Sequence, residues 1–469
     1  YIFKIIPYFL YAFCIMNTEL LSPAGSLKNM RYAFAYGADA VYAGQPRYSL
    51  RVRNNEFDHE NLKIGIDEAH ALGKKFYVVA NIQPHNSKLK NFIRDIEPII
   101  AMQPDALIMS DPGLIMMVRE HFPDMPIHLS VQANAINWAT VKFWKDYGLS
   151  RVILSRELAL EEIEEIQKNV PEIELEVFVH GALCMAYSGR CLLSGYMNKR
   201  DANQGACTNA CRWEYKIHEA QEDVNGDVIP VQQIEQSKQC CSNKVQDDLV
   251  QSVLVQRNDE EMFAAEEDEH GTYFMNSKDL RAIQHVDRLT HMGIASLKIE
   301  GRTKSYFYCA RTAQIYRKAI DDALSGQPFD SSLMDQLEGL ANRGYTEGFL
   351  RRHVHSDYQN YEDGSSHFDY QQFCGEVIER NGDYVRVEVK NRFLVGDTLE
   401  LMTPKGNLVF TLTEMRDLKG YPIENAKGSG HIVKIPLSAD IDITYALLIR
   451  NLPHAKTQLK TDALAYSAD

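Results

Sequence analysis

The most constraining feature of this 469-residue chain is a repeated pattern between residue 16 and about residue 325. A short apolar run ends in a polar residue or a glycine, an amphipathic segment follows, and the next apolar run begins. Segments such as residues 62–73 carry apolar residues at helical i, i+3, i+4 spacing and finish on glycine. The alternation predicts βαβ units and a parallel sheet. The predicted strands are Glu19–Ser22, Ala40–Gly44, Lys75–Asn81, Ala106–Asp111, Ile127–Asn134, Arg151–Arg156, Glu174–Gly181, Thr272–Ser277 and Ser296–Gly301.

The number of runs separates the two common folds that are built from βαβ units. Nine candidate strands fit a (β/α)8-type barrel with one extra strand better than a doubly wound sheet. No G-x-G-x-x-G segment follows the first run, so the usual sign of a dinucleotide-binding domain is missing from the sequence. We predict an α/β barrel over residues 16–352, with a Cys-rich segment and an irregular insertion at about residues 216–270.

A second domain follows a polar linker at residues 353–369. Beyond the linker the hydrophobic period changes to two, as in the segments YVRVEV and HIVKIPL, and turn signals such as Asn381-Gly382 separate the short runs. This pattern predicts a small all-β domain, a β-barrel, over residues 370–455. Its expected role is binding or packing.

The amino-terminal segment and the charge balance set expectations about location. Residues 1–15 are apolar, but they are fewer than the ~20 residues of a membrane-spanning helix, and Pro7 interrupts them. We expect this segment to be non-native or upstream sequence and the protein to be cytoplasmic, beginning at Met16 and without membrane association. A formal net charge of −14 argues against a general polyanion-coating protein but permits a local basic groove.

Polar residues follow the predicted strands at their carboxyl ends, where barrel enzymes bind ligands. His128, Ser130 and Gln132 alternate with apolar residues and should point into the barrel. His180 and Glu300 end two other runs and are the catalytic candidates. For each residue singly, a structural role in a polar barrel layer is an equal alternative. The expected rim residues are Ser22, Gln45, Asn81, Asp111, Gln132, Asn134, Arg156, His180, Asn276, Glu300 and Arg302.

Several arginines lie near the same rim and could bind phosphates or a carboxylate, since a guanidinium makes bidentate contacts with both. A solvated basic face is the alternative interpretation. Lys298 ranks lower because it shares a strand face with Glu300 and can form a local ion pair. The candidate substrate-binding residues are Arg302, Arg47, Arg51, Arg53 and Gln132.

Four of the nine cysteines, Cys184, Cys191, Cys207 and Cys211, lie within 28 residues of one another. Disulfides would need an oxidising compartment, for which the sequence shows no export signal. Structural zinc sites usually have C-x2–4-C pairs in both halves, and the first spacing here is C-x6-C. An iron–sulfur cluster also takes four thiolates, with looser spacing rules. The spacing therefore favours an iron–sulfur cluster, with zinc and buried free thiols as alternatives.

The segment EVFVHGALCMAYSGRCLLS, residues 176–194, matches the signature E-x-F-x-x-G-[SA]-[LIVM]-C-x4-G-x-C-x-[LIVM]-S. The chain thereby resembles the collagenase-like peptidase (U32) family. Residues 19–25, 38–44 and 296–302 are similar to the same family. The resemblance covers roughly residues 16–451 and is weakest across residues 216–265.

Within the family, residues 36–215 resemble the branch that hydroxylates tRNA. The resemblance implies a prephenate-dependent, oxygen-independent conversion of the tRNA wobble uridine to 5-hydroxyuridine, the first step toward 5-carboxymethoxyuridine. The implied partners are tRNA and prephenate. A 4Fe-4S cluster of a related branch maps onto Cys184, Cys191 and Cys207, and Cys211 is the fourth ligand by its spacing.

The alternatives are a collagenase-like peptidase and hydroxylation of another substrate such as ribosomal RNA. The sequence has neither a G-x-S-x-G segment nor an H-E-x-x-H helix. A cysteine protease would need a thiolate with a histidine partner, and His180 with Cys184 is the one candidate pair.

Overall fold

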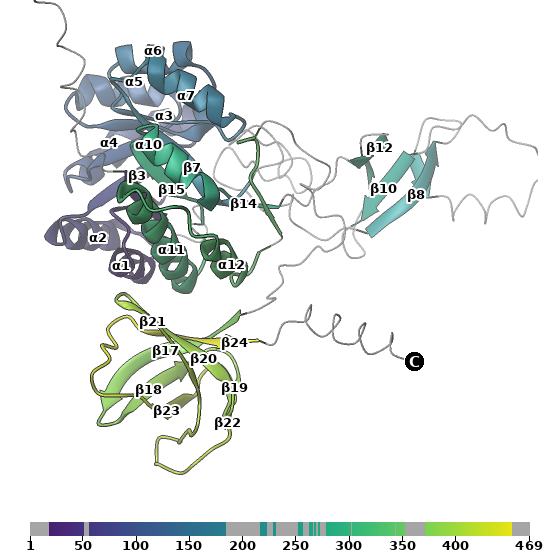
Figure 1. Ribbon diagram of the computed structural model, residues 1–469. Helices are drawn as coiled ribbons and strands as arrows, with labels where there is room; N and C mark the ends of the chain where they lie inside the picture. Colours follow the sequence, from purple (N-terminus) through teal and green to yellow (C-terminus); the bar gives the residue numbers. More distant parts are fainter. Residues whose placement is uncertain are drawn as a thin grey trace, which may run out of the picture.

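The computed structural model describes residues 18–50, 56–183, 278–301, 303–342, 344–351 and 371–452, together with the backbone of six short strands within residues 216–272. Two main bodies are visible in Figure 1: a ring of helices around a parallel sheet, and a smaller domain of strands. Among the described residues, no helix is both long enough and apolar enough to span a membrane.

The larger body is a closed barrel of eight parallel strands. Strands β1 to β7 pair in chain order, and β15 pairs with both β7 and β1, which closes the barrel. The predicted (β/α)8-type fold is therefore confirmed. The barrel strands are β1 (Glu19–Pro23), β2 (Ala40–Gly44), β3 (Lys75–Ala80), β4 (Ala106–Met109), β5 (Ile127–Leu129), β6 (Arg151–Ile153), β7 (Glu174–Ala182) and β15 (Ser296–Ile299).

The helices surround the barrel, and several of them begin at polar capping residues. The side chains of Ser26, Asp58 and Asn137 each accept a hydrogen bond from the backbone N–H three residues further on, which satisfies a donor that the first helical turn leaves open. The helices are α1 (Leu27–Ala35), α2 (His59–Ala71), α3 (Asn86–Leu89), α4 (Phe92–Ile100), α5 (Pro112–His121), α6 (Trp138–Asp146), α7 (Leu160–Asn169), α10 (Val286–His291), α11 (Tyr306–Leu324) and α12 (Ser332–Glu338), with 3-10 turns at Val131–Ala133 and Ile283–His285.

The extra strand differs from the expected one. Of the predicted strand Thr272–Ser277, Thr272 ends β13 (Gly271–Thr272), which pairs with β12 (Glu267–Asp268), and the other residues lie outside the described ones. The strand added to the barrel is β14 (Asp279–Arg281), which runs antiparallel to β7 and carries β16 (Tyr345–Thr346) on its other edge.

The insertion, expected to be irregular, contains a four-stranded antiparallel sheet in the order β11-β10-β8-β9. Its central strand β10 contains the run Val253-Leu254-Val255, which pairs with a strand on each side. The strong β propensity of that run accounts for the difference, and the acidic residues around it conceal it in the sequence. The strands are β8 (Lys216–Glu222), β9 (Val228–Pro230), β10 (Ser252–Gln256) and β11 (Met262–Ala265).

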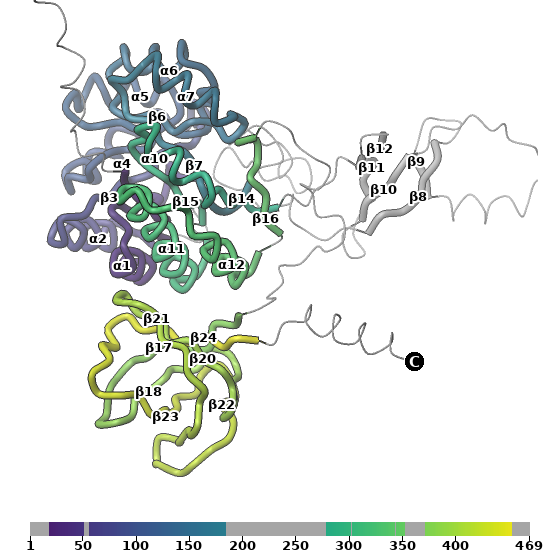
Figure 2. Tube along the Cα trace, viewed as in Figure 1, coloured from purple at the N-terminus to yellow at the C-terminus, as the bar shows by residue number. Residues whose placement is uncertain are grey.

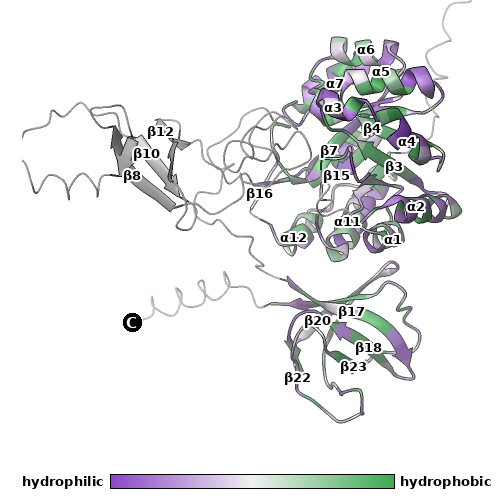
Figure 3. Ribbon diagram, turned by 180° about the vertical axis from the view of Figure 1, so that it is seen from behind, coloured by the Kyte–Doolittle hydropathy of each residue, from purple (hydrophilic) through white to green (hydrophobic). Residues whose placement is uncertain are grey.

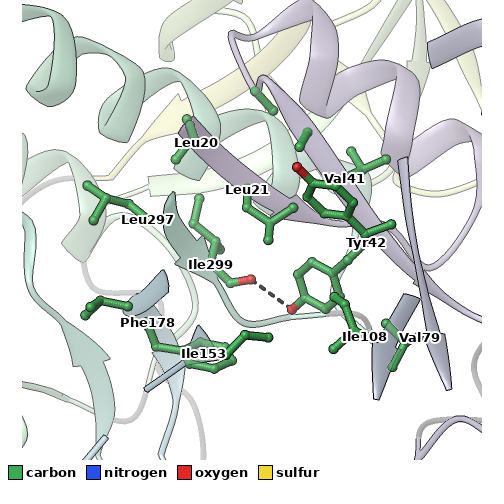
Figure 4. Packing of buried hydrophobic residues seen from close by; sticks show 14 of the residues in the cluster. Leu20, Leu21, Val41, Tyr42, Val79, Ile108, Ile153, Phe178, Leu297 and Ile299 are labelled. Atoms are coloured by element: carbon green, nitrogen blue, oxygen red, sulfur yellow. Dashed lines mark hydrogen bonds between the residues drawn. The ribbon is translucent and has the colours of Figure 1, made fainter. Parts of the chain in front are cut away.

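Apolar side chains fill the middle of the barrel. Hydrophobic stretches concentrate on the barrel strands, inside the ring of helices (Figure 3). Figure 4 shows Leu21, Tyr42, Ile108 and Phe178 converging from four strands, and the Tyr42 hydroxyl donates to the carbonyl oxygen of Ile299 at 2.9 Å. This layer closes the lumen between the polar groups at its two ends.

The carboxyl-terminal domain is all-β, as predicted. Its main sheet has the order β21-β20-β24-β17-β18-β23, and these pairings alone do not close it into the predicted barrel. The strands are β17 (Gln371–Asn381), β18 (Tyr384–Val389), β20 (Thr398–Thr403), β21 (Gly406–Thr411), β23 (Ile432–Pro436) and β24 (Leu447–Asn451), with a separate pair of β19 (Phe393–Leu394) and β22 (Asn425–Ala426).

The small domain packs against helices α1 and α11 of the barrel (Figure 2). The guanidinium of Arg311 on α11 forms a buried ion pair with Glu400 on β20 at 2.8 Å. The hydroxyl of Tyr36, the residue that follows α1, donates to the carbonyl oxygen of Met402 at 2.9 Å, and the hydroxyl of Tyr32 on α1 donates to Glu376 at 2.7 Å. These buried polar contacts fix the orientation of the domain on the outer surface of the barrel.

Candidate functional site at the carboxyl end of the barrel

A network of charged residues occupies the amino-terminal end of the barrel lumen. Arg151, the first residue of β6, contacts Glu19 at 2.6 Å, Glu174 at 2.7 Å and Glu176 at 3.1 Å. Lys298 also contacts Glu176, at 2.7 Å. Lys298 therefore forms a local ion pair, as expected, but its partner is Glu176 on the neighbouring strand β7.

Burial by itself would raise the pKa of the Glu19 carboxyl, but Arg151 and Lys75, with a hydrogen bond from Tyr77, hold that pKa below its ordinary value. The carboxylate therefore stays ionised inside the protein. Since these charges neutralise one another at the end of the barrel opposite to the usual active-site rim, the network serves the structure.

His128 lies in the lumen, as the alternation in β5 predicts. Its ring packs edge-on against Tyr77, with a centroid separation of 4.7 Å. Burial lowers the pKa of His128 well below its ordinary value, and the positive charges of Arg151, Lys298 and Lys75 lower it further. The imidazole is therefore neutral at physiological pH.

The predicted strand Ile127–Asn134 is shorter in the structure than the sequence suggests. It ends at Leu129, a 3-10 turn follows, and Asn134 adopts a left-handed conformation with φ of 52°. The turn, rather than a strand, positions the buried Gln132. Nearby, the Asn81 amide donates to the Ser130 hydroxyl at 3.2 Å, so an expected rim residue contacts a residue that was expected to face the lumen.

Three strands bring Arg156, Glu300 and Tyr42 together at the carboxyl end of the barrel. Arg156 Nη2 lies 3.7 Å from Glu300 Oε2, and the Tyr42 hydroxyl lies 3.4 Å from the same carboxylate oxygen. The guanidinium carbon of Arg156 lies 3.9 Å from the ring centroid of Phe178. A cation, a carboxylate and a phenol thus meet at the rim where barrel enzymes perform chemistry.

The Arg156 side chain is only 8% exposed. Its Nε atom is buried and has no hydrogen-bond partner among the residues that the structure describes. From the sequence, Arg156 was expected at the rim but was not one of the candidate substrate-binding residues. The signal that could have identified it is an arginine directly after a strand end, where ligand-binding side chains of barrels gather.

A β-bulge interrupts the pairing of β7 with β15 beside His180. Lys298 pairs with Phe178 but Ile299 pairs with His180, so β7 contains one extra residue at this point. The bulge turns the His180 ring toward Tyr308 and Tyr316 of α11, with centroid separations of 5.8 Å and 5.5 Å. Burial lowers the pKa of His180 to about 3, and the charges of Lys304 and Arg281 contribute. These are the surroundings of a neutral, packed histidine.

Other expected rim residues serve the local structure. Asp111 caps α5 by accepting from the Leu114 N–H at 2.9 Å. The register pairs Ser22 with Val41 and leaves Ser22 on the strand face opposite Glu19, toward the helices. Arg47 is exposed and pairs with Asp95 of α4 at 2.6 Å, so it is engaged on the outer surface. Arg51, Arg53, Asn276 and Arg302 lie outside the described residues.

The four clustered cysteines, Cys184, Cys191, Cys207 and Cys211, also lie outside the described residues. Cys309 and Cys374 are buried free thiols, and burial raises the pKa of each to about 12. Within the described ranges, no group of three or more His, Cys, Asp or Glu side chains could hold a metal ion.

Comparison with known proteins covers both domains. The sequence profile of peptidase family U32 matches residues 25–360, and that of the U32 C-terminal domain matches residues 369–450. The chain is 67% identical over 456 residues to the tRNA hydroxylation protein P of Escherichia coli, covering 94% of this chain and 100% of the relative. It is 66% identical over 449 residues to the protein of that name from Haemophilus influenzae, covering 94% of this chain and 97% of the relative. It is also 28% identical over 402 residues to the 23S rRNA 5-hydroxycytidine C2501 synthase of Escherichia coli, covering 82% of this chain and 52% of that enzyme.

Proposed function

Because the chain belongs to peptidase family U32, we propose that, like the tRNA hydroxylation proteins to which it is 66–67% identical, it hydroxylates tRNA. The observation that carries the proposal is the 67% identity to a tRNA hydroxylation protein across its whole length. The similarity includes the barrel and the carboxyl-terminal domain, so the full architecture is shared. The rim of the barrel supports an enzymatic role, since a cation, a carboxylate and a phenol meet there.

The proposed reaction converts the wobble uridine to 5-hydroxyuridine, with prephenate as the co-substrate. The family resemblance suggests both molecules. A buried guanidinium at the barrel rim, Arg156, suits a small acid that carries carboxylates. Arg302, Arg51 and Arg53 are further anion-binding candidates by their positions in the sequence.

The proposed metal centre consists of Cys184, Cys191, Cys207 and Cys211 holding a 4Fe-4S cluster. Four thiolates are the donor set that such clusters take. Strand β7 ends at Ala182, two residues before the first of these cysteines, so the sequence leads directly from the carboxyl end of a barrel strand into the cysteine segment. A cluster of this kind, when bound, supplies one-electron redox chemistry.

Peptide hydrolysis receives less support from the described residues. A catalytic cysteine needs a histidine that can take its proton. His180 instead packs against the tyrosines of α11, and its pKa is lowered to about 3, chiefly by burial. Ribosomal RNA hydroxylation rests on the lower, 28% identity to a synthase of which the match covers 52%.

The deciding experiment is complementation of a bacterial strain whose tRNA lacks 5-hydroxyuridine. Nucleosides from purified tRNA and from 23S ribosomal RNA would be quantified by mass spectrometry. The expected result is restored 5-hydroxyuridine in tRNA, with 5-hydroxycytidine in ribosomal RNA unchanged. A chain that is well expressed but restores no tRNA hydroxyuridine contradicts the proposal, and a gain of hydroxycytidine in ribosomal RNA would favour the ribosomal alternative. Digestion of unfolded collagen by the purified chain would favour the peptidase.

A further inference from the structure

The strongest unexplained feature of the barrel is the hydrogen-bonding state of Arg156. Its side chain is more than nine-tenths buried, yet the nearest carboxylate oxygen among the described residues is 3.7 Å away, beyond the range of an N–H···O hydrogen bond. The Nε donor next to it is buried and makes no hydrogen bond within the described part of the chain. The Nε of Arg311 also lacks a partner, but a terminal nitrogen of Arg311 lies 2.8 Å from Glu400. Arg156 has no carboxylate that close among the described residues, and burying a charge without a close partner is costly.

Three other buried cations of this protein each have a carboxylate within hydrogen-bond distance. Arg151 contacts three carboxylates, the nearest at 2.6 Å. Lys298 lies 2.7 Å from Glu176, and Arg311 lies 2.8 Å from Glu400. Compared with these three, Arg156 lacks a close anion, and it is the one that lies at the carboxyl end of the barrel.

Phe178 contacts the guanidinium of Arg156 through its face rather than its edge. The guanidinium carbon lies 3.9 Å from the Phe178 ring centroid, a contact that holds the flat group through its face. Nε and one terminal nitrogen form the edge that binds a carboxylate through two parallel hydrogen bonds. Glu300 lies beside this edge at 3.7 Å without closing it.

We propose that Arg156 is a carboxylate-binding residue for the small organic acid used by the enzyme. The acid's carboxylate would bind the Nε–Nη2 edge, while Phe178 supports the guanidinium from its face. This inference rests on the proposed function, for which the acid is prephenate. An RNA phosphate fits less well, because contacts with the nucleic-acid backbone are made by accessible side chains and Arg156 is only 8% exposed.

The test is isothermal titration of the anaerobically purified full-length protein with prephenate. We expect Arg156→Gln to weaken prephenate binding by about 30-fold or more, since it removes a charged partner from a desolvated carboxylate. Arg156→Lys keeps the positive charge but loses the bidentate edge. Its affinity for prephenate should therefore lie between those of the wild type and Arg156→Gln. Arg94→Gln is the matched control, because Arg94 is 70% exposed and pairs with Asp95 on the outer helix α4. It should bind prephenate like the wild type.

Two further measurements keep the outcomes separate. Thermal unfolding and iron content show whether Arg156→Gln is folded. If it is not, the prephenate affinity of Arg156→Lys decides whether Arg156 binds the carboxylate. A gel-shift assay with tRNA should show equal binding by the wild type and Arg156→Gln.

Equal prephenate affinity of the folded Arg156 variants and the wild type overturns this inference and leaves tRNA hydroxylation intact. A loss of tRNA binding in Arg156→Gln overturns it in favour of a phosphate contact. If the wild type itself binds no prephenate, the assignment of the co-substrate fails, and the carboxylate site fails with it.

Discussion

The charge network in the lumen provides a quantitative test of what holds the barrel together. Arg151 is 2% exposed and contacts Glu19, which is 7% exposed, and Glu176, which is fully buried. Arg151→Met keeps an extended apolar side chain but removes the positive charge. Breaking a buried ion pair by removing one partner costs about 3–5 kcal/mol, because the other charge stays buried without compensation. Lys75 and Lys298 still contact the two carboxylates, so the lower end of that range, about 3 kcal/mol, is expected.

The pH dependence of the loss distinguishes charge from packing. In the wild type the pKa of Glu19 is below its ordinary value, so its ion pairs contribute stability that is lost as pH falls through that folded pKa. Without Arg151, burial dominates and the pKa of Glu19 rises. Protonation then relieves the buried charge at a higher pH than in the wild type. The difference in unfolding free energy between variant and wild type should therefore shrink between pH 7 and about pH 5.

The assay is urea unfolding followed by circular dichroism at both pH values. The matched control is Arg288→Met, because Arg288 also contacts two glutamates but is 43% exposed, and exposed pairs contribute little. Adding Glu19→Gln to Arg151→Met should recover part of the lost stability. A loss in Arg151→Met that is equal at the two pH values, or no greater than that of Arg288→Met, would refute the electrostatic account.

Three further predictions concern the metal site and strand β7. Anaerobically purified protein should contain iron and sulfide in near-equal amounts, and Cys191→Ser should lose both; stoichiometric zinc without sulfide would contradict the cluster. Since burial lowers the pKa of His180 to about 3 from 6.5, the folded state disfavours its charged form, and His180→Phe should lose less stability than the wild type as pH falls below about 6.5. If wild type and His180→Phe lose the same stability in urea unfolding as the pH falls, the buried histidine is not the cause of the acid sensitivity. Gly181→Ala should destabilise the fold by at least about 1–3 kcal/mol, because φ is +101° and the new Cβ would lie 2.4 Å from the carbonyl oxygen of Glu300. Gly73→Ala, with φ of +66° and no atom within 4 Å of its new Cβ, should cost less stability. Thermal unfolding of both variants and the wild type checks the prediction.

The sequence by itself determined the barrel and the all-β domain, because these depend on local periodicity. The runs that begin at Glu19, Ala40, Lys75 and Ser296 start where strands β1, β2, β3 and β15 start. A change from helical spacing to a period of two is visible along the chain without knowledge of any distant contact. The family signature, residues 176–194, likewise consists of adjacent residues and could be read directly.

Tertiary structure decided which polar residues meet and which way each one faces. Arg151 and Glu19 are separated by 132 residues, and the closure of the barrel brings them into contact. His180 was expected at the rim as a catalytic candidate, but one extra residue in the pairing of β7 with β15 turned its ring toward α11. Arg156 and Arg47 are both arginines that follow barrel strands, yet one is buried beside Glu300 and the other forms an exposed pair with Asp95. A periodic pattern specifies the local backbone conformation, whereas a side chain's partners depend on strand register and packing, which arise only when distant segments come together.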